Sequence, residues 1–163
     1  MQTVLTLLRA LVYAAGFVLL WGWLALTVQP LDRSLGAALP AWVTGVGWVL
    51  VVAGAAIVLA CVGWFVVRGA GTPAPFDAPR RFVARGPYRY VRNPMYLGGW
   101  GVLAGWGLLL RSPAILLLSF VMLGGAHLFV VLYEEPTLER RFGNEYQLYR
   151  KDVRRWLPRL PGD

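Results

Sequence analysis

The chain has 163 residues, of which 58% are hydrophobic, and a mean hydropathy of +0.56. This composition excludes an ordinary soluble domain of this size and indicates a membrane protein. The formal net charge is +8, and a basic face beside anionic lipid headgroups accounts for it without nucleic acid. The single cysteine, Cys61, has no partner for a disulfide and no Cys or His at ligand spacing, so neither a redox role nor a metal site is predicted.

Four apolar stretches are the main structural signal. The first two exceed the roughly 20 residues needed to cross about 30 Å of hydrocarbon. A third, longer stretch is interrupted by Arg111-Ser112-Pro113, which predicts a hairpin of two helices. The predicted spans are about 3–28, 39–67, 94–110 and 114–133. We therefore expect an all-α polytopic membrane protein forming a single domain over 1–163, with its last two spans as a helical hairpin.

The basic residues predict the orientation of these spans. Fourteen of the sixteen Lys and Arg residues fall on one side, and Arg33 and Arg111 fall on the other. Basic residues resist translocation, so both termini, the loop 68–93 and the tail 134–163 are predicted to be cytoplasmic. The segment 69–84 is rich in Gly, Pro and Ala, which favours an irregular loop. Arginine outnumbers lysine 15 to 1, a bias typical of a GC-rich bacterial genome, so we expect the bacterial inner membrane.

The junction from Gly86 to Gly99 is the candidate site, because it joins arginines and three tyrosines to the start of a membrane helix. Asn93-Pro94 is a helix-start signal, and the free N–H groups of a helix start favour a carboxylate or phosphate. Asn93 either caps the helix or contacts a ligand. The span that follows has 17 residues and reaches only about 25 Å, so a ligand could approach Tyr96 from lipid or from water.

Two acids, Glu134 and Glu135, end the last predicted span. Carboxylates at the negative end of a helix dipole are unfavourable unless a cation answers them. Alternatively, Pro136 opens a short helix whose positive end favours both acids. The first reading predicts a nearby cation, which is either a loop arginine or the ammonium of a ligand.

Three residues deeper in the hairpin are also informative. His127 is the only histidine, and we expect it to be neutral and hydrogen-bonded within the bundle. Gly101 and Gly124 lie at similar depth on the two arms, which predicts close backbone contact between them. Glycine faces serve packing within and between chains equally, so the oligomeric state stays open.

The tail contains a further helical pattern. Gly143 and Asn144 indicate the end of one helix and the start of another. Tyr146, Tyr149 and Val153 share one face of the second helix among basic residues. This pattern predicts an amphipathic element lying on the inner membrane surface, with anionic lipids as partners.

Four motifs occur in an order that resembles a known superfamily. They are Gly-Pro-Tyr-Arg-Tyr-Val-Arg-Asn-Pro-Met-Tyr-Leu-Gly at 86–98, Glu-Glu-Pro at 134–136, Phe-Gly-x-x-Tyr-x-x-Tyr at 142–149 and Trp-Leu-Pro-Arg at 156–159. The region 71–159 is similar to the isoprenylcysteine carboxyl methyltransferase and phospholipid methyltransferase superfamily. The resemblance implies an integral membrane enzyme that uses S-adenosylmethionine without a Rossmann fold.

The resemblance also implies a set of cofactor-binding residues. By position these are Tyr88, Tyr90, Arg92, Asn93, Pro94, Tyr96, Leu97, Glu134 and Glu135. Two departures stand out, because Asn93 replaces a histidine found in many members and Arg154 replaces a proline. A role that needs an imidazole is therefore not carried over to Asn93.

The residue chemistry matches the same donor independently. One acid suits its ammonium, Arg92 or the helix start suits its carboxylate, and tyrosine faces suit its sulfonium. The predicted catalytic residues are Arg89, Glu135 and Arg150. Arg89 or Arg150 could orient an acidic acceptor, whereas an amine acceptor needs a base, for which Glu134 or Glu135 is the candidate.

The predicted function is methyl transfer to a lipophilic acceptor that enters from the inner leaflet. The acceptor stays open among an isoprenylcysteine carboxylate, a phospholipid amine, a thiol and a small isoprenoid or phenolic metabolite. One alternative is an NADPH-dependent membrane reductase of sterol or steroid type, whose similar motif has Asn and Glu where this chain has Met95 and Gly99. Another is a non-catalytic protein that binds anionic lipid, although electrostatic anchoring needs neither the acids nor the tyrosines.

Overall fold

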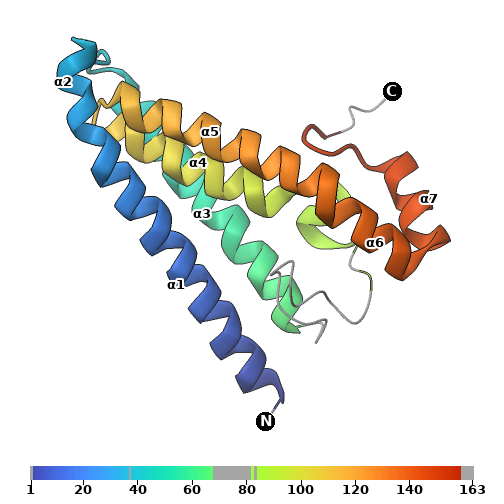
Figure 1. Cartoon of the computed structure of the whole chain (residues 1–163). Helices are drawn as coiled ribbons and strands as arrows, with labels where there is room; N and C mark the ends of the chain where they lie inside the picture. The colour runs from blue at the N-terminus through green and yellow to red at the C-terminus, as the bar shows by residue number, and fades with distance from the viewer. Residues whose placement is uncertain (1, 37, 68–81, 83, 159–163) are drawn as a thin grey trace.

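The computed structural model describes residues 2–36, 38–67, 82 and 84–158, and its regular elements are all helical (Figure 1). The elements are α1 Gln2–Val28, the 3-10 turn η1 Gln29–Leu31, α2 Asp32–Leu35, α3 Val43–Val67, the 3-10 turn η2 Gly86–Arg89, α4 Pro94–Leu109, α5 Pro113–Phe129, the π-helical turn η3 Val130–Glu134, α6 Glu135–Phe142 and α7 Asn144–Asp152. Most of the loop expected at 69–84 lies outside the described residues, as does the end of the tail from 159.

Three of the described helical stretches are long and apolar enough to cross a membrane, namely Leu11–Leu35, Val43–Trp64 and Pro113–Phe142. They correspond to the first, second and fourth predicted spans. The third predicted span, α4, has 16 residues and is therefore only about 24 Å long. Its length alone does not establish a fourth crossing.

Glycines bring α3 and α4 into direct backbone contact. A Cβ atom added to Gly98 would lie 2.8 Å from the Gly54 carbonyl oxygen, and one added to Gly105 would lie 2.7 Å from that of Gly47. The pairing of Gly54 with Gly98 and of Gly47 with Gly105 makes the two helices antiparallel. Small residues permit this close approach in a bilayer, where burial of apolar surface does not drive helices together.

The contact predicted between Gly101 and Gly124 is wrong. Gly101 faces α3, where an added Cβ would lie 3.4 Å from the carbonyl oxygen of Leu50. Around Gly124, the described residues leave open space within 4 Å of such an atom. The second arm instead packs against α4 near the turn, where Gly107 meets the backbone of Leu116. The glycine face of α4 therefore serves α3 rather than α5.

Three segments are tied together at the hairpin turn. The Asp32 carboxylate accepts a hydrogen bond from the Ala114 backbone N–H at 2.9 Å, and Ser112 caps the start of α5. The Arg111 Nε donates to the Leu39 carbonyl oxygen at 2.6 Å. These bonds satisfy polar groups at one end of the bundle and leave the other end, where α6 and α7 lie, for the predicted site (Figure 1).

The C-terminal part of helix α1 packs against the hairpin. Ala25 is fully buried against Leu103 and Ile115, whereas Leu11 and Leu19 are 62% and 72% exposed. Figure 1 shows α1 moving away from the other helices toward the N-terminus. Exposed apolar side chains on a helix long enough to span a membrane are suited to lipid contact.

Candidate functional site

The candidate site lies where η2 leads into α4. Gly86 has a φ of +62°, and a Cβ atom there would collide with the Trp64 ring at 2.2 Å. Only glycine fits this turn against α3. The Tyr88 side chain is half-buried in this turn, and desolvation raises the pKa of Tyr88 well above its usual value, with nearby Cys61 and Glu134 raising it further. Tyr88 is thus held between α3 and the last span.

Asn93 does not cap α4. Helix α4 begins at Pro94 as predicted, but the Asn93 side chain makes no capping bond. Its Nδ2 instead donates to the Arg155 carbonyl oxygen at 3.2 Å, and the residue is buried, with 6% of its surface exposed. Of the two sequence interpretations, the simple helix cap is therefore wrong, and Asn93 links the start of α4 to the tail.

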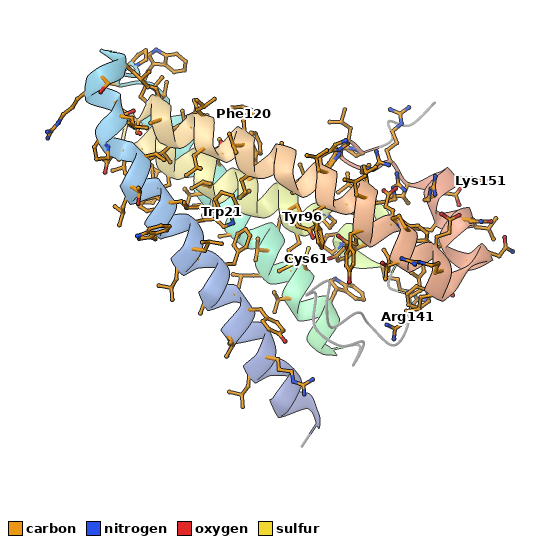
Figure 2. All side chains as sticks on the ribbon, in the orientation of Figure 1. Trp21, Cys61, Tyr96, Phe120, Arg141 and Lys151 are labelled. Atoms are coloured by element: carbon orange, nitrogen blue, oxygen red, sulfur yellow. The ribbon has the colours of Figure 1, made fainter. Side chains whose placement is uncertain are left out.

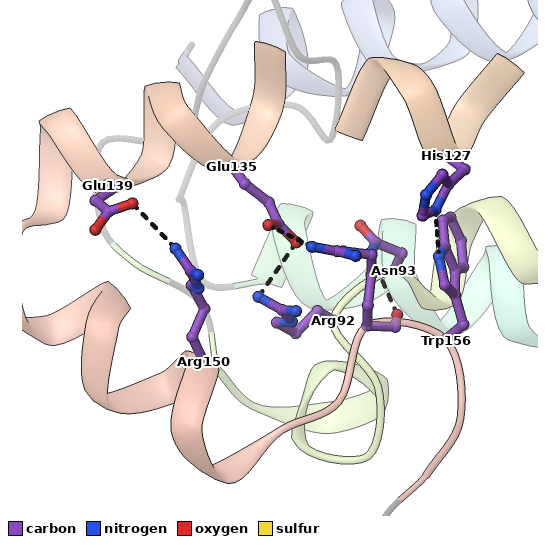
Figure 3. Close-up of polar contacts among 8 residues, drawn as sticks. Arg92, Asn93, His127, Glu135, Glu139, Arg150 and Trp156 are labelled. Carbon is purple, nitrogen blue, oxygen red and sulfur yellow. Dashed lines mark hydrogen bonds and ion pairs between the residues drawn. The ribbon is translucent and has the colours of Figure 1, made fainter. Parts of the chain in front are cut away.

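The two acids face different partners. The Tyr96 hydroxyl donates to Glu134 Oε2 at 3.0 Å. Arg155 donates to both oxygens of Glu135, from Nε at 2.8 Å and from Nη2 at 2.9 Å. Glu135 also pairs with Arg92, whose Nη1 lies 3.2 Å from Oε1. Figure 3 shows two guanidinium groups meeting the Glu135 carboxylate. A cation therefore lies beside Glu135, as one sequence interpretation predicted, whereas Glu134 is bonded to a hydroxyl. The other interpretation also holds in part, because Pro136 lies in the first turn of the short helix α6.

Arg92 is held in an unusual environment for a cation. Its side chain is only 11% exposed, and its buried Nε and Nη1 have no hydrogen-bond partner within the described part of the chain. The contact of Nη1 with Glu135 is an ion pair without hydrogen-bond geometry. Buried donors that lack partners carry a free energy penalty of about 1–3 kcal/mol each. Arg92 therefore retains capacity for a further anionic partner.

The tail closes the site at the end of the bundle where α6 and α7 lie. Residues 154–156, here called the tail strap, make further hydrogen bonds besides the Arg155–Glu135 bonds and the Asn93 bond just described. The Arg92 backbone N–H donates to the Arg154 carbonyl oxygen at 2.9 Å. The Trp156 Nε1 donates to His127 Nδ1 at 3.0 Å, as Figure 3 shows. His127 is hydrogen-bonded as predicted, but its partner lies in the tail and not within the bundle.

An aromatic cluster supports the strap. Tyr146, Tyr149 and Val153 are buried, and Phe82 and Phe142 pack against them. The Tyr149 hydroxyl donates to the Tyr88 carbonyl oxygen at 2.6 Å. Burial raises the pKa of Tyr146 to about 12, and the nearby Glu135 carboxylate acts in the same direction. The predicted apolar face of α7 is confirmed, but it packs against protein, and the expectation that it lies against the membrane is wrong.

Arg155 is the main residue that the sequence interpretation missed. Its hydrogen bonds to Glu135 raise its pKa above the usual range. In the sequence it is one of four basic residues between 150 and 155, and apart from Arg150 these are interpreted as membrane anchors. The contact with Glu135 is what distinguishes Arg155 from the neighbouring basic residues.

Several predicted site residues lie at the edge of this cluster. The Arg89 guanidinium stacks over the Tyr90 ring at 5.1 Å, and Tyr90 is 59% exposed. Arg150 pairs with Glu139 at 3.1 Å rather than with the two acids. The side chains of Glu139, Gln147 and Arg150 line an open pocket on α6 and α7. Pro94 and Leu97 shape the first turn of α4.

The charged groups gather at this end of the molecule. Figure 2 shows Arg141 and Lys151 on the α6–α7 end, and Trp21 and Phe120 on the apolar helices away from it. The cytoplasmic position of this end stays a prediction from the basic bias of the sequence.

Comparisons with known proteins agree with the resemblance seen in the sequence. Residues 42–145 match the family described as phospholipid methyltransferase. An uncharacterized protein of Haemophilus influenzae is 36% identical over 63 residues, which are 39% of this chain and all of that protein. No solved structure matches the chain.

Proposed function

Because the chain belongs to the phospholipid methyltransferase family, we propose that it transfers a methyl group from S-adenosylmethionine to a lipophilic acceptor at the inner leaflet. The observation that carries the proposal is the meeting of Arg92, Tyr96 and the two acids at one end of the bundle. These groups come from segments about 40 residues apart in the chain. Family membership supports methyl transfer, and the geometry supports a compact, charged donor.

The residues present fit the ends of this donor. The buried N–H groups of Arg92 that lack partners suit its carboxylate, because a charge-assisted bond would satisfy them. Both Glu135 oxygens are already bound by Arg155, whereas Glu134 accepts a hydrogen bond from the Tyr96 hydroxyl and makes no ion pair within the described part of the chain. We therefore assign the ammonium to Glu134 and a structural role to Glu135. The Tyr88 and Tyr96 rings are the candidates near the sulfonium.

Bound S-adenosylmethionine supplies an electrophilic methyl group on a positively charged sulfur. The contribution of the protein is then to hold the reacting groups in line and to keep water away. The tail strap and the aromatic cluster below it suit the second task. Arg89 and Arg150 remain candidates for orienting an anionic acceptor, and Glu134 remains the candidate base for an amine.

The orientation completes the proposal. Helix α4 packs antiparallel to α3 along the glycine contacts and is joined to α5 by a short turn, which supports α4 as the third of four crossings. Both termini then lie in the cytoplasm, in the inner membrane of a bacterium. Anionic lipids of the inner leaflet are the expected partners of the exposed basic residues on α6 and α7.

The test is titration of S-adenosylmethionine into the purified protein by calorimetry. We expect saturable binding that is weakened about tenfold or more by Glu134→Gln, because a charge-assisted bond is lost. Glu139→Gln, on the same helix but paired with the exposed Arg150, is the matched control and should bind normally. Saturable binding of NADPH with none of S-adenosylmethionine would replace the proposal by the reductase alternative.

The acceptor is then found with labelled S-adenosylmethionine in membranes. Label recovered in phospholipid would identify an amine headgroup, and label in protein would identify a prenylated cysteine. Label in a smaller apolar product would identify a metabolite. Donor binding with no label in any lipophilic fraction would contradict the proposed acceptor class.

A further inference from the structure

The last long helix is continuous but not regular. Helix α5 passes through the π-helical turn η3 into α6, and the Glu135 backbone N–H bonds to the Val130 carbonyl oxygen five residues earlier. A π-helical turn contains one more residue than the α-helical turn it replaces. At about 100° per residue, the extra residue rotates everything after it by about a quarter turn relative to α5.

Pro136 stands at the point where this turn ends. Proline has no N–H, and its ring collides with the carbonyl four residues before it in a regular helix. That carbonyl belongs to Leu132, inside the π-helical turn. Widening the helix at this place avoids the collision. The Thr137 hydroxyl donates to the Tyr133 carbonyl oxygen at 2.7 Å, which satisfies a second backbone group affected by the irregular turn.

The two acids lie at the end of the widened turn. Glu134 is its last residue and Glu135 the first of α6. With the extra residue, Glu134 reaches the Tyr96 hydroxyl at 3.0 Å, and Glu135 reaches Arg155 at 2.8 Å. In a regular helix continuing α5, both side chains would be turned by about 100° from these directions.

We propose that Pro136 is a positioning residue, which enforces the π-helical turn and thereby aims Glu134 and Glu135 at the donor site. The expected effect on donor binding rests on the proposed function, but the effect of Pro136 on the direction of the two acids does not. Pro136 touches neither donor nor acceptor in this scheme. It acts only by setting the rotation of α6 relative to α5.

The test compares two variants. One is Pro136→Ala, and the other combines Pro136→Ala with deletion of Leu132. Alanine allows a regular helix, which turns the acids away, so donor affinity should fall about tenfold or more. Deleting Leu132 removes the extra residue and should restore most of the affinity. Leu132 is 74% exposed, so its loss removes no packed side chain. Pro113→Ala, at the start of α5 where no earlier turn needs realignment, is the control.

Stability separates positioning from a merely structural role. Alanine is strongly favoured over proline in a helix, and this gain is similar in size to the loss expected when the Glu135 ion pairs are broken. The melting temperature of Pro136→Ala should therefore stay near the wild-type value while donor affinity falls. A variant that keeps wild-type affinity would overturn the proposal, because the turn would then not depend on the proline. Lost affinity that the deletion fails to restore would also overturn it.

A second measurement does not depend on the proposed function. In a Cys61→Ser background, Tyr96→Cys and Glu134→Cys should be joined by a short bifunctional thiol reagent. Adding Pro136→Ala should reduce this cross-linking severalfold, and further deleting Leu132 should restore it. If the wild-type protein binds no donor while cross-linking follows this pattern, only the proposed function fails. Unchanged cross-linking in Pro136→Ala would refute the positioning role whatever the ligand.

Discussion

Glu135 is expected to be the acid on which the stability of the site depends. Its carboxylate accepts two bonds from Arg155 and lies 3.2 Å from Arg92. The Glu135 side chain is 9% exposed, and those of Arg92 and Arg155 are 11% and 29% exposed. Removing one partner of a buried ion pair costs about 3–5 kcal/mol. Because glutamine keeps one acceptor oxygen and Arg155 is partly exposed, we expect Glu135→Gln to lower the free energy of unfolding by about 2–3 kcal/mol.

Glu139 provides a matched comparison four residues further along α6. It also pairs with an arginine, Arg150, at 3.1 Å, but the two side chains are 38% and 42% exposed. Exposed ion pairs contribute about 0–1 kcal/mol. Glu139→Gln should therefore change stability by no more than this. The two substitutions make the same chemical change on one helix and differ mainly in burial.

The chain offers a direct assay for this difference. Cys61 is its only cysteine and is fully buried, so a fluorogenic thiol reagent reacts with the protein only when the bundle opens. In detergent and without donor, the melting temperature of Glu135→Gln should fall by roughly 5–10 °C, and that of Glu139→Gln should barely change. Equal shifts for the two variants would refute the argument that burial of the Glu135 cluster stabilises the site.

Two further predictions concern packing and the second acid. Gly98→Ala places a Cβ 2.8 Å from the Gly54 carbonyl oxygen and should destabilise the bundle by about 1–3 kcal/mol. Gly124→Ala, in open space, should be neutral or stabilising by up to about 1 kcal/mol. The thiol assay measures both variants, and equal effects would contradict the α3–α4 contact. Tyr96→Phe removes the 3.0 Å bond to Glu134 and should lower donor affinity or turnover about tenfold with little change in melting temperature. Wild-type kinetics in that variant would show that the hydroxyl is not used.

Much of the local structure follows from residues close together in the chain. Asn93-Pro94 marked the start of α4 correctly, because proline is suited to the first helical turn. The hairpin turn at Arg111-Ser112-Pro113 was also placed correctly, since proline cannot continue a helix. A cation near the Glu134-Glu135 pair was predicted from a helix end, but the helix continues past the acids through η3 into α6. One cation, Arg92, is a loop arginine of the kind predicted, whereas Arg155 lies in the tail, and only the folded chain brings it to Glu135.

Composition and local pattern by themselves determined that this chain is helical, that it belongs in a membrane and that the candidate site lies at the Arg92 end. These properties depend on the apolar length of each stretch and on charge bias, which neighbouring residues decide. Tertiary structure alone decided that the Gly101 face meets α3, that α7 packs on protein and that Glu134 and Glu135 point in different directions. Those outcomes depend on the rotation of one helix against another. For Glu134 and Glu135, a single extra residue in the turn before Pro136 changes this rotation by about 100°.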